Sequence, residues 1–181
     1  WLLPDAAARP LEAAALDQQR ALAVLGARYS ANAYAWSTAY QNCNQWVAEL
    51  LALAWGGVDT AGAGDARQRA QQWLRAQGYQ PTAITVASPL VTLAGAVLPW
   101  LHTSDHPADD VRRQQFSTSL PASLGAFVQQ QVPGTQRLEF CHDTRQMVVR
   151  RSGVPMGPGC SAGPGDQVLA LPAPVRAADG A

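Results

Sequence analysis

One stretch of the chain restricts the fold more than any other, the segment "NCNQWVAELLALA" at residues 42–54. Its apolar residues recur at the spacing of one helix face, and they are Cys43, Trp46, Val47, Leu50, Leu51 and Ala54. Asn42 is a favourable N-cap, and Gln45 three residues later completes an approximate capping box. The segment therefore predicts a helix over residues 43–55 that buries this stripe and organises a core.

The other elements are predicted from local periodicity and from helix-ending or turn residues. The patterns predict a helix over 4–26, an ordered loop or short strand over 27–40, a helix over 65–77, a strand over 79–86, a helix over 119–132 capped by Ser119, and a hairpin of 137–140 with 146–151. Because helices come early and strands late, the predicted fold class is α+β. We expect one α+β domain over residues 1–153 and a Gly/Pro-rich irregular tail over residues 154–181.

The composition is that of a globular protein with a sizeable core. The chain has 181 residues, of which 48% are hydrophobic and 14% are charged. Its 13 arginines balance 13 acidic residues, so the charge does not favour nucleic acid or an anionic membrane surface as a partner. The longest apolar candidate, residues 88–102, is shorter than the ~18 residues of a membrane span and contains two prolines. We therefore predict no membrane span.

Cys43 is the candidate nucleophile, because it lies in the first turn of the predicted helix. The N–H groups and the macrodipole at a helix N-terminus stabilise a thiolate. The N–H groups around Asn42 and Asn44 can also donate to an oxyanion that forms on an attacked carbonyl. Cysteine peptidases of the papain type use this arrangement with a histidine base. The alternative is an inert core thiol at the start of the apolar stripe.

Several segments carry a resemblance to known bacterial proteins. "YQNCNQWVAELL" (40–51) is similar to the "NC-x-x-[FW]-V" segment of the papain-like NlpC/P60 superfamily, particularly of its circularly permuted branches. The chain also resembles the uncharacterised bacterial domain of unknown function family 2145. This resemblance is carried by "YSANAYAWSTAYQNCNQWVAELLA" (29–52), "AQQWLRAQGYQPTAI" (70–84), "SDHP" (104–107), "FSTSLPASL" (116–124) and "VVRRSG" (148–153).

The resemblance implies an exported protein with a papain-like core. Members of the family look like proteins with an N-terminal signal and a further N-terminal half, which carries a Tyr-Ser-His-type segment where permuted enzymes keep their base. The chain begins at Trp1, so we expect it to be the C-terminal part of such a protein, mature, cleaved or truncated. Some relatives have Ser at the position of Cys43, which leaves cysteine catalysis open for the family as a whole.

A general base for the Cys43 thiol would be one of the histidines of the chain. There are three, His102, His106 and His142. His106 follows Cys43 by 63 residues, as in unpermuted enzymes, and Asp105 or Asp109 could orient it. It is our predicted base within this chain, and the alternatives are an upstream histidine or a solvated loop at "HTSDHPADD".

A metal site or cofactor is not predicted. His102, Asp105 and His106 would share one face if their segment were helical, but Pro107 favours a loop there. The sequence has no second cluster with ligand spacing.

Cys141 and Cys160 bracket the predicted hairpin and its return. The export implied by the family resemblance would place them in an oxidising compartment, where they would form a disulfide. Cys43 would then be the odd thiol of the three. The alternative is that all three cysteines are reduced and buried.

Together these expectations describe a periplasmic or secreted protein. Its predicted activity is cysteine hydrolysis of an amide or ester, with peptide or cell-wall material as the substrate class by analogy of fold. The alternative is a non-catalytic periplasmic subunit or binding protein that uses the same fold in a larger assembly, where its partner is another chain or its own N-terminal half.

Overall fold

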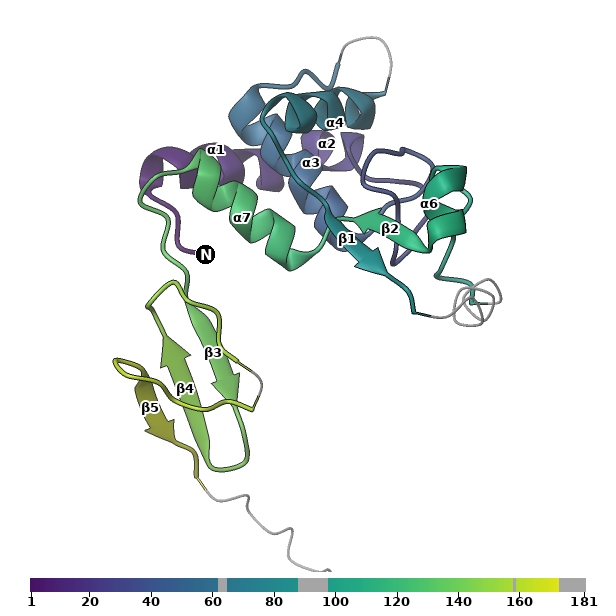
Figure 1. Cartoon of the computed structure of the whole chain (residues 1–181). Helices are drawn as coiled ribbons and strands as arrows, with labels where there is room; N and C mark the ends of the chain where they lie inside the picture. Colours follow the sequence, from purple (N-terminus) through teal and green to yellow (C-terminus); the bar gives the residue numbers. More distant parts are fainter. Residues whose placement is uncertain (62–64, 88–97, 158, 173–181) are drawn as a thin grey trace, which may run out of the picture. The chain divides into compact units, whose positions relative to one another are not determined.

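The structure is a computed structural model that describes residues 1–61, 65–87, 98–157 and 159–172 (Figure 1). The chain divides into two compact units. The helical unit comprises Pro4–Pro133, and the β unit comprises Trp1–Leu3 with Gly134–Ala181. The division falls between Pro133 and Gly134, whereas the sequence analysis expected one domain over residues 1–153.

The helical unit is built from short helices and one pair of strands. Its described helices are α1 (Asp5–Leu16), α2 (Gln18–Ala23), α3 (Cys43–Gly56), α4 (Ala66–Ala76), α6 (Ala108–Arg113) and α7 (Pro121–Gln131). Strands β1 (Thr82–Thr85) and β2 (Gln115–Thr118) pair antiparallel, with Thr82 opposite Thr118. The predicted class α+β is therefore confirmed, while the apolar segment 88–102 lies largely outside the described residues.

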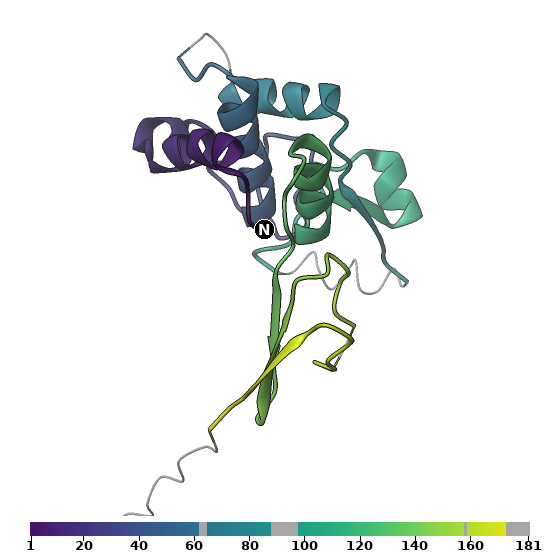
Figure 2. The ribbon, with the colours of Figure 1, turned by 90° about the vertical axis from the view of Figure 1, so that its left-hand side faces the viewer.

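Helix α3 is the centre of the helical unit and packs against α1, α4 and α7 (Figure 2). Leu51 and Leu53 are 2% and 0% exposed, and fully burying a leucine side chain contributes about 1.5–3 kcal/mol. Asn42 caps the helix by accepting from Gln45 N, and Gly57 ends it with φ of 58°. The predicted helix and its N-cap are thus confirmed.

The buried face of α3 differs from the predicted stripe. Leu50 and Leu51 are buried as expected, but Cys43 is exposed and Trp46 is half-buried. Two polar side chains, Gln45 and Glu49, are buried instead. The face that meets the core is therefore rotated toward polar residues that find hydrogen-bond partners in other elements.

Two predicted segments differ locally from the structure. The helix predicted over residues 4–26 is divided into α1 and α2 at Asp17, which is extended and whose Oδ1 accepts from Arg20 N. Asp prefers such a cap to a helix interior, so it starts a new helix there. The loop "HTSDHPADD" ends in α6, which begins after Pro107 with Asp109 and Asp110 in its first turn.

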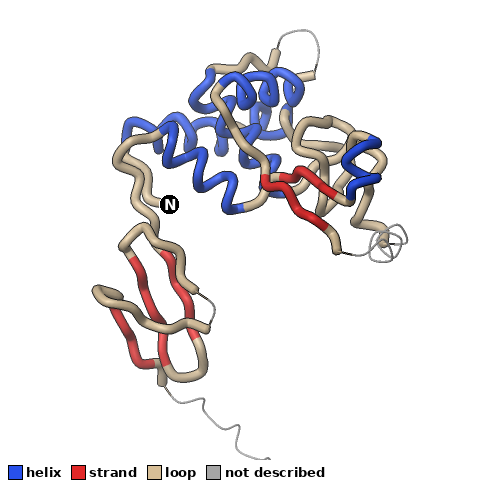
Figure 3. The backbone as a smooth tube through the Cα atoms, in the orientation of Figure 1, coloured by secondary structure: helices blue, strands red, loops and turns tan. Residues whose placement is uncertain are grey.

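The β unit contains an antiparallel three-stranded sheet of β3 (Glu139–His142), β4 (Gln146–Arg150) and β5 (Gln167–Ala170) (Figure 3). The predicted hairpin is confirmed as β3 and β4, with Cys141 opposite Val148. Strand β5 lies in the segment expected to be irregular, where the surrounding glycines and prolines obscure its short apolar pattern. A disulfide joins Cys141 and Cys160, whose Cα atoms are 5.3 Å apart.

Candidate functional site

The thiol of Cys43 is exposed at the first residue of α3. The two residues before Cys43 are buried: Gln41 is 4% exposed and Asn42 is 3% exposed. Asn44, the next residue of the first turn, is half-buried. The chain therefore presents one free thiol from a helix start that is otherwise packed into the protein.

The Asn42 side chain holds this helix start through four hydrogen-bond contacts. Its Oδ1 accepts from Gln45 N at 2.7 Å. Its Nδ2 lies 3.2 Å from Ala31 O, 3.0 Å from Thr118 Oγ1 and 3.1 Å from Ser119 O. The cap thus joins α3 to the preceding loop and to the end of β2, and the position of Cys43 follows from it.

Cys43 opens into a pocket of about 310 Å³. The lining residues come from the α2–α3 loop and the first turn of α3, and they are Leu25, Gly26, Arg28, Tyr29, Gln41, Asn42, Cys43 and Trp46. Leu25 and Tyr29 are 53% and 55% exposed, so the apolar part of this lining is open to solvent. Arg28 supplies a positive charge at the same pocket.

A stack of side chains leads from this pocket to His102. The Arg28 guanidinium lies 4.7 Å from the centre of the Tyr40 ring. The other ring contact of Tyr40 is with His102, at 4.4 Å between centres and an interplanar angle of 14°. Neither Arg28 nor the stacking of His102 on Tyr40 was predicted from the sequence, because no local pattern links residues so distant in the chain.

His106, the predicted base, is buried in a different environment. Its side chain is 0% exposed, its Nε2 lies 2.7 Å from Asn32 O, and its ring packs edge-on against Phe116. The carbonyl can only accept, so Nε2 carries the proton in this contact. Among the described residues, no hydrogen bond or ring contact joins His106 to Cys43.

The two predicted orienting residues, Asp105 and Asp109, have other partners. Asp105 Oδ2 accepts from Tyr34 N at 2.8 Å, and Asp109 pairs with Arg112 on the surface of α6. Asp105 Oδ1 lies 3.9 Å from His106 Nε2, beyond hydrogen-bond distance. His106 and Asp105 therefore hold the loop that contains Asn32 and Tyr34.

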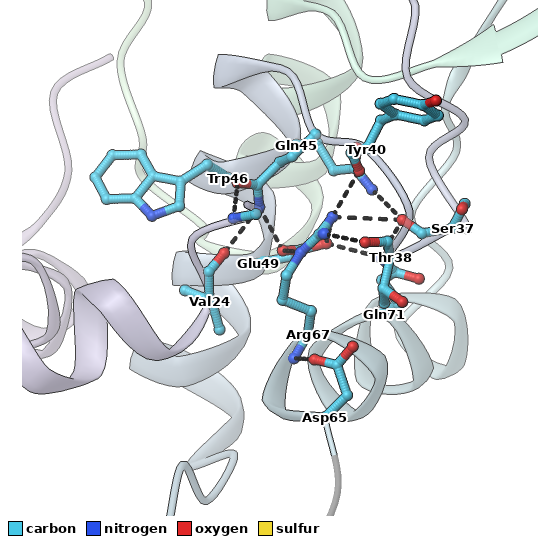
Figure 4. A network of polar contacts seen from close by, with 12 residues as sticks. Val24, Ser37, Thr38, Tyr40, Gln45, Trp46, Glu49, Asp65, Arg67 and Gln71 are labelled. Carbon is cyan, nitrogen blue, oxygen red and sulfur yellow. Dashed lines mark hydrogen bonds and ion pairs between the residues drawn. The ribbon is translucent and has the colours of Figure 1, made fainter. Parts of the chain in front are cut away.

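Beneath the loop that precedes Cys43, α3 and α4 share a buried polar cluster (Figure 4). Arg67 Nε donates to Glu49 Oε2 at 2.8 Å, and the two side chains are 5% and 0% exposed. Gln41 Nε2 and Gln71 Nε2 each donate to the same carboxylate at 2.7 Å. Burial raises the pKa of Glu49 above its ordinary value, although the bonds from Arg67, Gln71 and Gln41 oppose that rise.

This cluster also binds the backbone of the loop. Arg67 Nη1 donates to Thr38 O at 2.8 Å and Arg67 Nη2 donates to Tyr40 O at 3.0 Å. Ser37 O accepts from Gln71 Nε2 at 3.0 Å and from Gln45 Nε2 at 3.1 Å. Polar side chains of α3 and α4 thereby satisfy carbonyls that would otherwise be buried without partners.

His102, Asp105 and His106, the residues that would share a face in a helical segment, do not form a metal-binding group in the described structure. Across the described ranges, no three His, Cys, Asp or Glu side chains form a group that could hold a metal ion. His142, the remaining histidine, belongs to β3 of the β unit. In the same described part of the chain, no helix is both long and apolar enough to cross a bilayer.

Comparison with known proteins identifies the family but adds no relative of known structure. No curated protein and no solved structure gives a significant match to the chain. One family model matches residues 1–128, which include Cys43, its pocket, His102 and His106. That family is described as an uncharacterized protein conserved in bacteria (DUF2145), and the chain belongs to it.

Proposed function

We propose that this protein is a cysteine hydrolase that acts on an amide or ester, with Cys43 as its nucleophile. The observation that carries the proposal is the exposed thiol at the first residue of α3, beside a pocket and next to a cap held by buried hydrogen bonds. A nucleophile that is already held in one position reacts faster, because no entropy is lost in ordering it during the reaction.

In the proposed reaction the Cys43 thiolate attacks the carbonyl carbon of the substrate. The N–H groups of the first turn of α3, at Cys43 and Asn44, donate to the oxyanion. The bond to the leaving amine or alcohol breaks as that group takes a proton from an imidazolium. Water then attacks the thioester while the imidazole removes a proton from the water, which releases the acid and restores the thiolate and the imidazolium.

The proposed reaction also needs an imidazole that can reach the leaving group and the attacking water. The His106 ring is buried and bonded to Asn32 O, so its use as the base would require that contact to break. His102 is connected to the pocket through Tyr40 and Arg28. We therefore propose His102 as the first imidazole to test, with His106 as the comparison.

The proposed setting is the periplasm or the cell exterior, with peptide or cell-wall material as substrate. The Cys141–Cys160 disulfide supports an oxidising compartment. We also propose that the core is papain-like, supported by a cysteine-bearing helix whose N-cap bonds to a strand, through Asn42 and Thr118. The substrate class is proposed by analogy of fold.

The test combines thiol labelling with turnover of a simple ester. We expect Cys43 to react with iodoacetamide faster than glutathione at neutral and mildly acidic pH. We also expect p-nitrophenyl acetate to acylate Cys43 and then to turn over. Cys43→Ala should abolish both signals, while His102→Gln should lower turnover by about 10²-fold or more if His102 is the base. A Cys43 that reacts no faster than glutathione and is never acylated would overturn the proposal.

A binding protein within a larger assembly is the second candidate. It is favoured by the exposed apolar side chains of Leu25 and Tyr29, which line the same pocket as Cys43. In that case Cys43→Ala should leave the biological role intact, whereas Leu25→Asp should disrupt it. A growth or envelope-integrity assay with both variants would separate the two candidates.

A further inference from the structure

We infer that Gln41 and Arg67 are positioning residues for the Cys43 pocket, and that Gly26 makes their arrangement possible. This inference rests on Cys43 being the functional thiol of the proposed activity. It concerns how two stretches of chain, residues 24–26 and 41–43, are held together as the sides of one pocket.

The first side of the pocket is held by the Gln41 side chain. Gly26 N donates to Gln41 Oε1 at 2.7 Å, and Gln41 Nε2 donates to Val24 O at 2.8 Å. The amide group therefore satisfies one donor and one acceptor of the segment that contributes Leu25 and Gly26 to the lining. Because both bonds come from a single planar group, this segment has a defined place relative to Gln41.

The same amide is tied to the buried ion pair. Gln41 Nε2 also donates to Glu49 Oε2 at 2.7 Å, and that oxygen accepts from Arg67 Nε at 2.8 Å. A carboxylate that accepts several charged and neutral donors holds each of them strongly, because the interior screens the interaction poorly. The orientation of the Gln41 amide is consequently set by α3 and α4.

The second side of the pocket is held by Arg67. Its guanidinium donates to the carbonyls of Thr38 and Tyr40, and Tyr40 is the residue directly before Gln41. One ion pair, Arg67 with Glu49, thus fixes the chain before the thiol and, through Gln41, the segment opposite it. Figure 4 shows Arg67 between Glu49 and the loop carbonyls.

Gly26 is required by the close packing at this point. A Cβ added to Gly26 would lie 2.8 Å from Gln41 Cβ and 3.0 Å from Arg67 Nη1. The first of these atoms is attached directly to the backbone and cannot move aside alone. A methyl group at residue 26 would therefore push the two sides of the pocket apart without touching Cys43.

The test measures the shape of the pocket through Cys43. Rates of labelling are compared for a small reagent, iodoacetamide, and a bulky one, fluorescein maleimide. We expect the ratio of the bulky-reagent rate to the small-reagent rate to rise about fivefold or more in the variants Gly26→Ala and Gln41→Met. In Gly26→Ala the added methyl group pushes the two sides apart, and Gln41→Met loses the bonds to Gly26 N and Val24 O. Arg67→Lys should also raise this ratio above the wild-type value. Lysine lacks the planar guanidinium that donates to two carbonyls and a carboxylate at once.

Two controls separate positioning from general instability. Val128→Ala on α7 removes a buried side chain that is no part of the pocket lining, so the ratio should not change although stability falls. Gly157→Ala adds a methyl group with no atom within 4 Å and should change neither quantity. A ratio that is unchanged in folded Gly26→Ala and Gln41→Met, or that changes equally in Val128→Ala, would overturn the inference.

A measurement on the wild-type chain covers the case in which variants fail to fold. The Gly26 amide should exchange its hydrogen slowly, because it donates to Gln41 Oε1. Fast exchange at Gly26 would overturn the inference without any substitution. The labelling ratio does not depend on turnover. A Cys43 that turns over no ester, but whose labelling ratio still rises in Gly26→Ala and Gln41→Met, would contradict the proposed hydrolase and leave the positioning inference standing.

Discussion

Glu49 of α3 and Arg67 of α4 form a buried ion pair, with 2.8 Å between Oε2 and Nε. The pair lies on no apolar stripe, yet it connects the two helices to the loop that leads to Cys43. Its partners, Gln41 and Gln71, satisfy the remaining positions on the carboxylate. The stability of the loop and of the candidate site should therefore depend on this one pair.

Arg67→Met should be strongly destabilising, because it leaves the Glu49 carboxylate buried without a cation. Removing one partner of a buried pair costs about 3–5 kcal/mol in the free energy of unfolding. Urea denaturation followed by tryptophan fluorescence would measure the loss. Arg113→Met on the surface of α6 is the matched control and should change stability by about 0.5 kcal/mol or less. Equal effects of the two substitutions would contradict the importance of the pair.

The pH dependence of stability should report the burial of Glu49. Burial raises the pKa of Glu49 above 4.5, so the folded protein keeps this proton where the unfolded chain has released it. Its contribution to stability is fully present below about pH 4.5 and is lost as the pH rises through the folded-state pKa.

The comparison that isolates this effect is wild type against Glu49→Gln. The free energy of unfolding of the wild type relative to the variant should fall as the pH rises from 4.5. Urea titrations at a series of pH values would measure it. A difference that stays constant with pH would show that Glu49 has the same pKa in the folded and unfolded states.

Asn42→Ala should cost more than the loss of an ordinary helix cap. An N-cap substitution alone costs about 0.5–2 kcal/mol. Asn42 also donates to Ala31 O, Thr118 Oγ1 and Ser119 O, and these contacts would lose their donor. We expect a total above about 2 kcal/mol in a thermal or urea titration.

The matched control for Asn42 is Asp17→Ala at the start of α2. Asp17 caps its helix through Arg20 N and is exposed, so its loss should stay within the range of a simple cap. If the two alanine variants lose equal stability, the bonds from Asn42 Nδ2 contribute nothing measurable.

The Cys141–Cys160 disulfide should stabilise the β unit. The two residues are 19 apart in sequence, and closing a loop of this size in the unfolded chain is worth about 3 kcal/mol in the chain-entropy description. Replacing both cysteines by Ser should therefore speed proteolysis of the β unit, while Cys43→Ser should not. Intact mass before and after reduction tests the bond directly, and an unchanged mass would refute it.

Local sequence determined the parts of this protein whose physical cause is local. The periodicity of residues 43–55, the capping side chain of Asn42 and the alternation on both sides of the β3–β4 turn each predicted an element that the structure contains. Asp17 and Pro107 could have been recognised as helix starts by the same reasoning, since Asp is a favourable cap and Pro commonly stands at the start of a helix.

Tertiary structure alone decided which polar residues are buried and what surrounds Cys43. Glu49, Gln45 and Arg67 are residue types that usually face solvent. They are buried here because their hydrogen-bond partners come from other elements. Cys43 stands on the predicted apolar stripe and is exposed, because the helix turns those polar residues inward. Burial of a polar group depends on partners distant in the chain, and spacing along one helix carries no information about them.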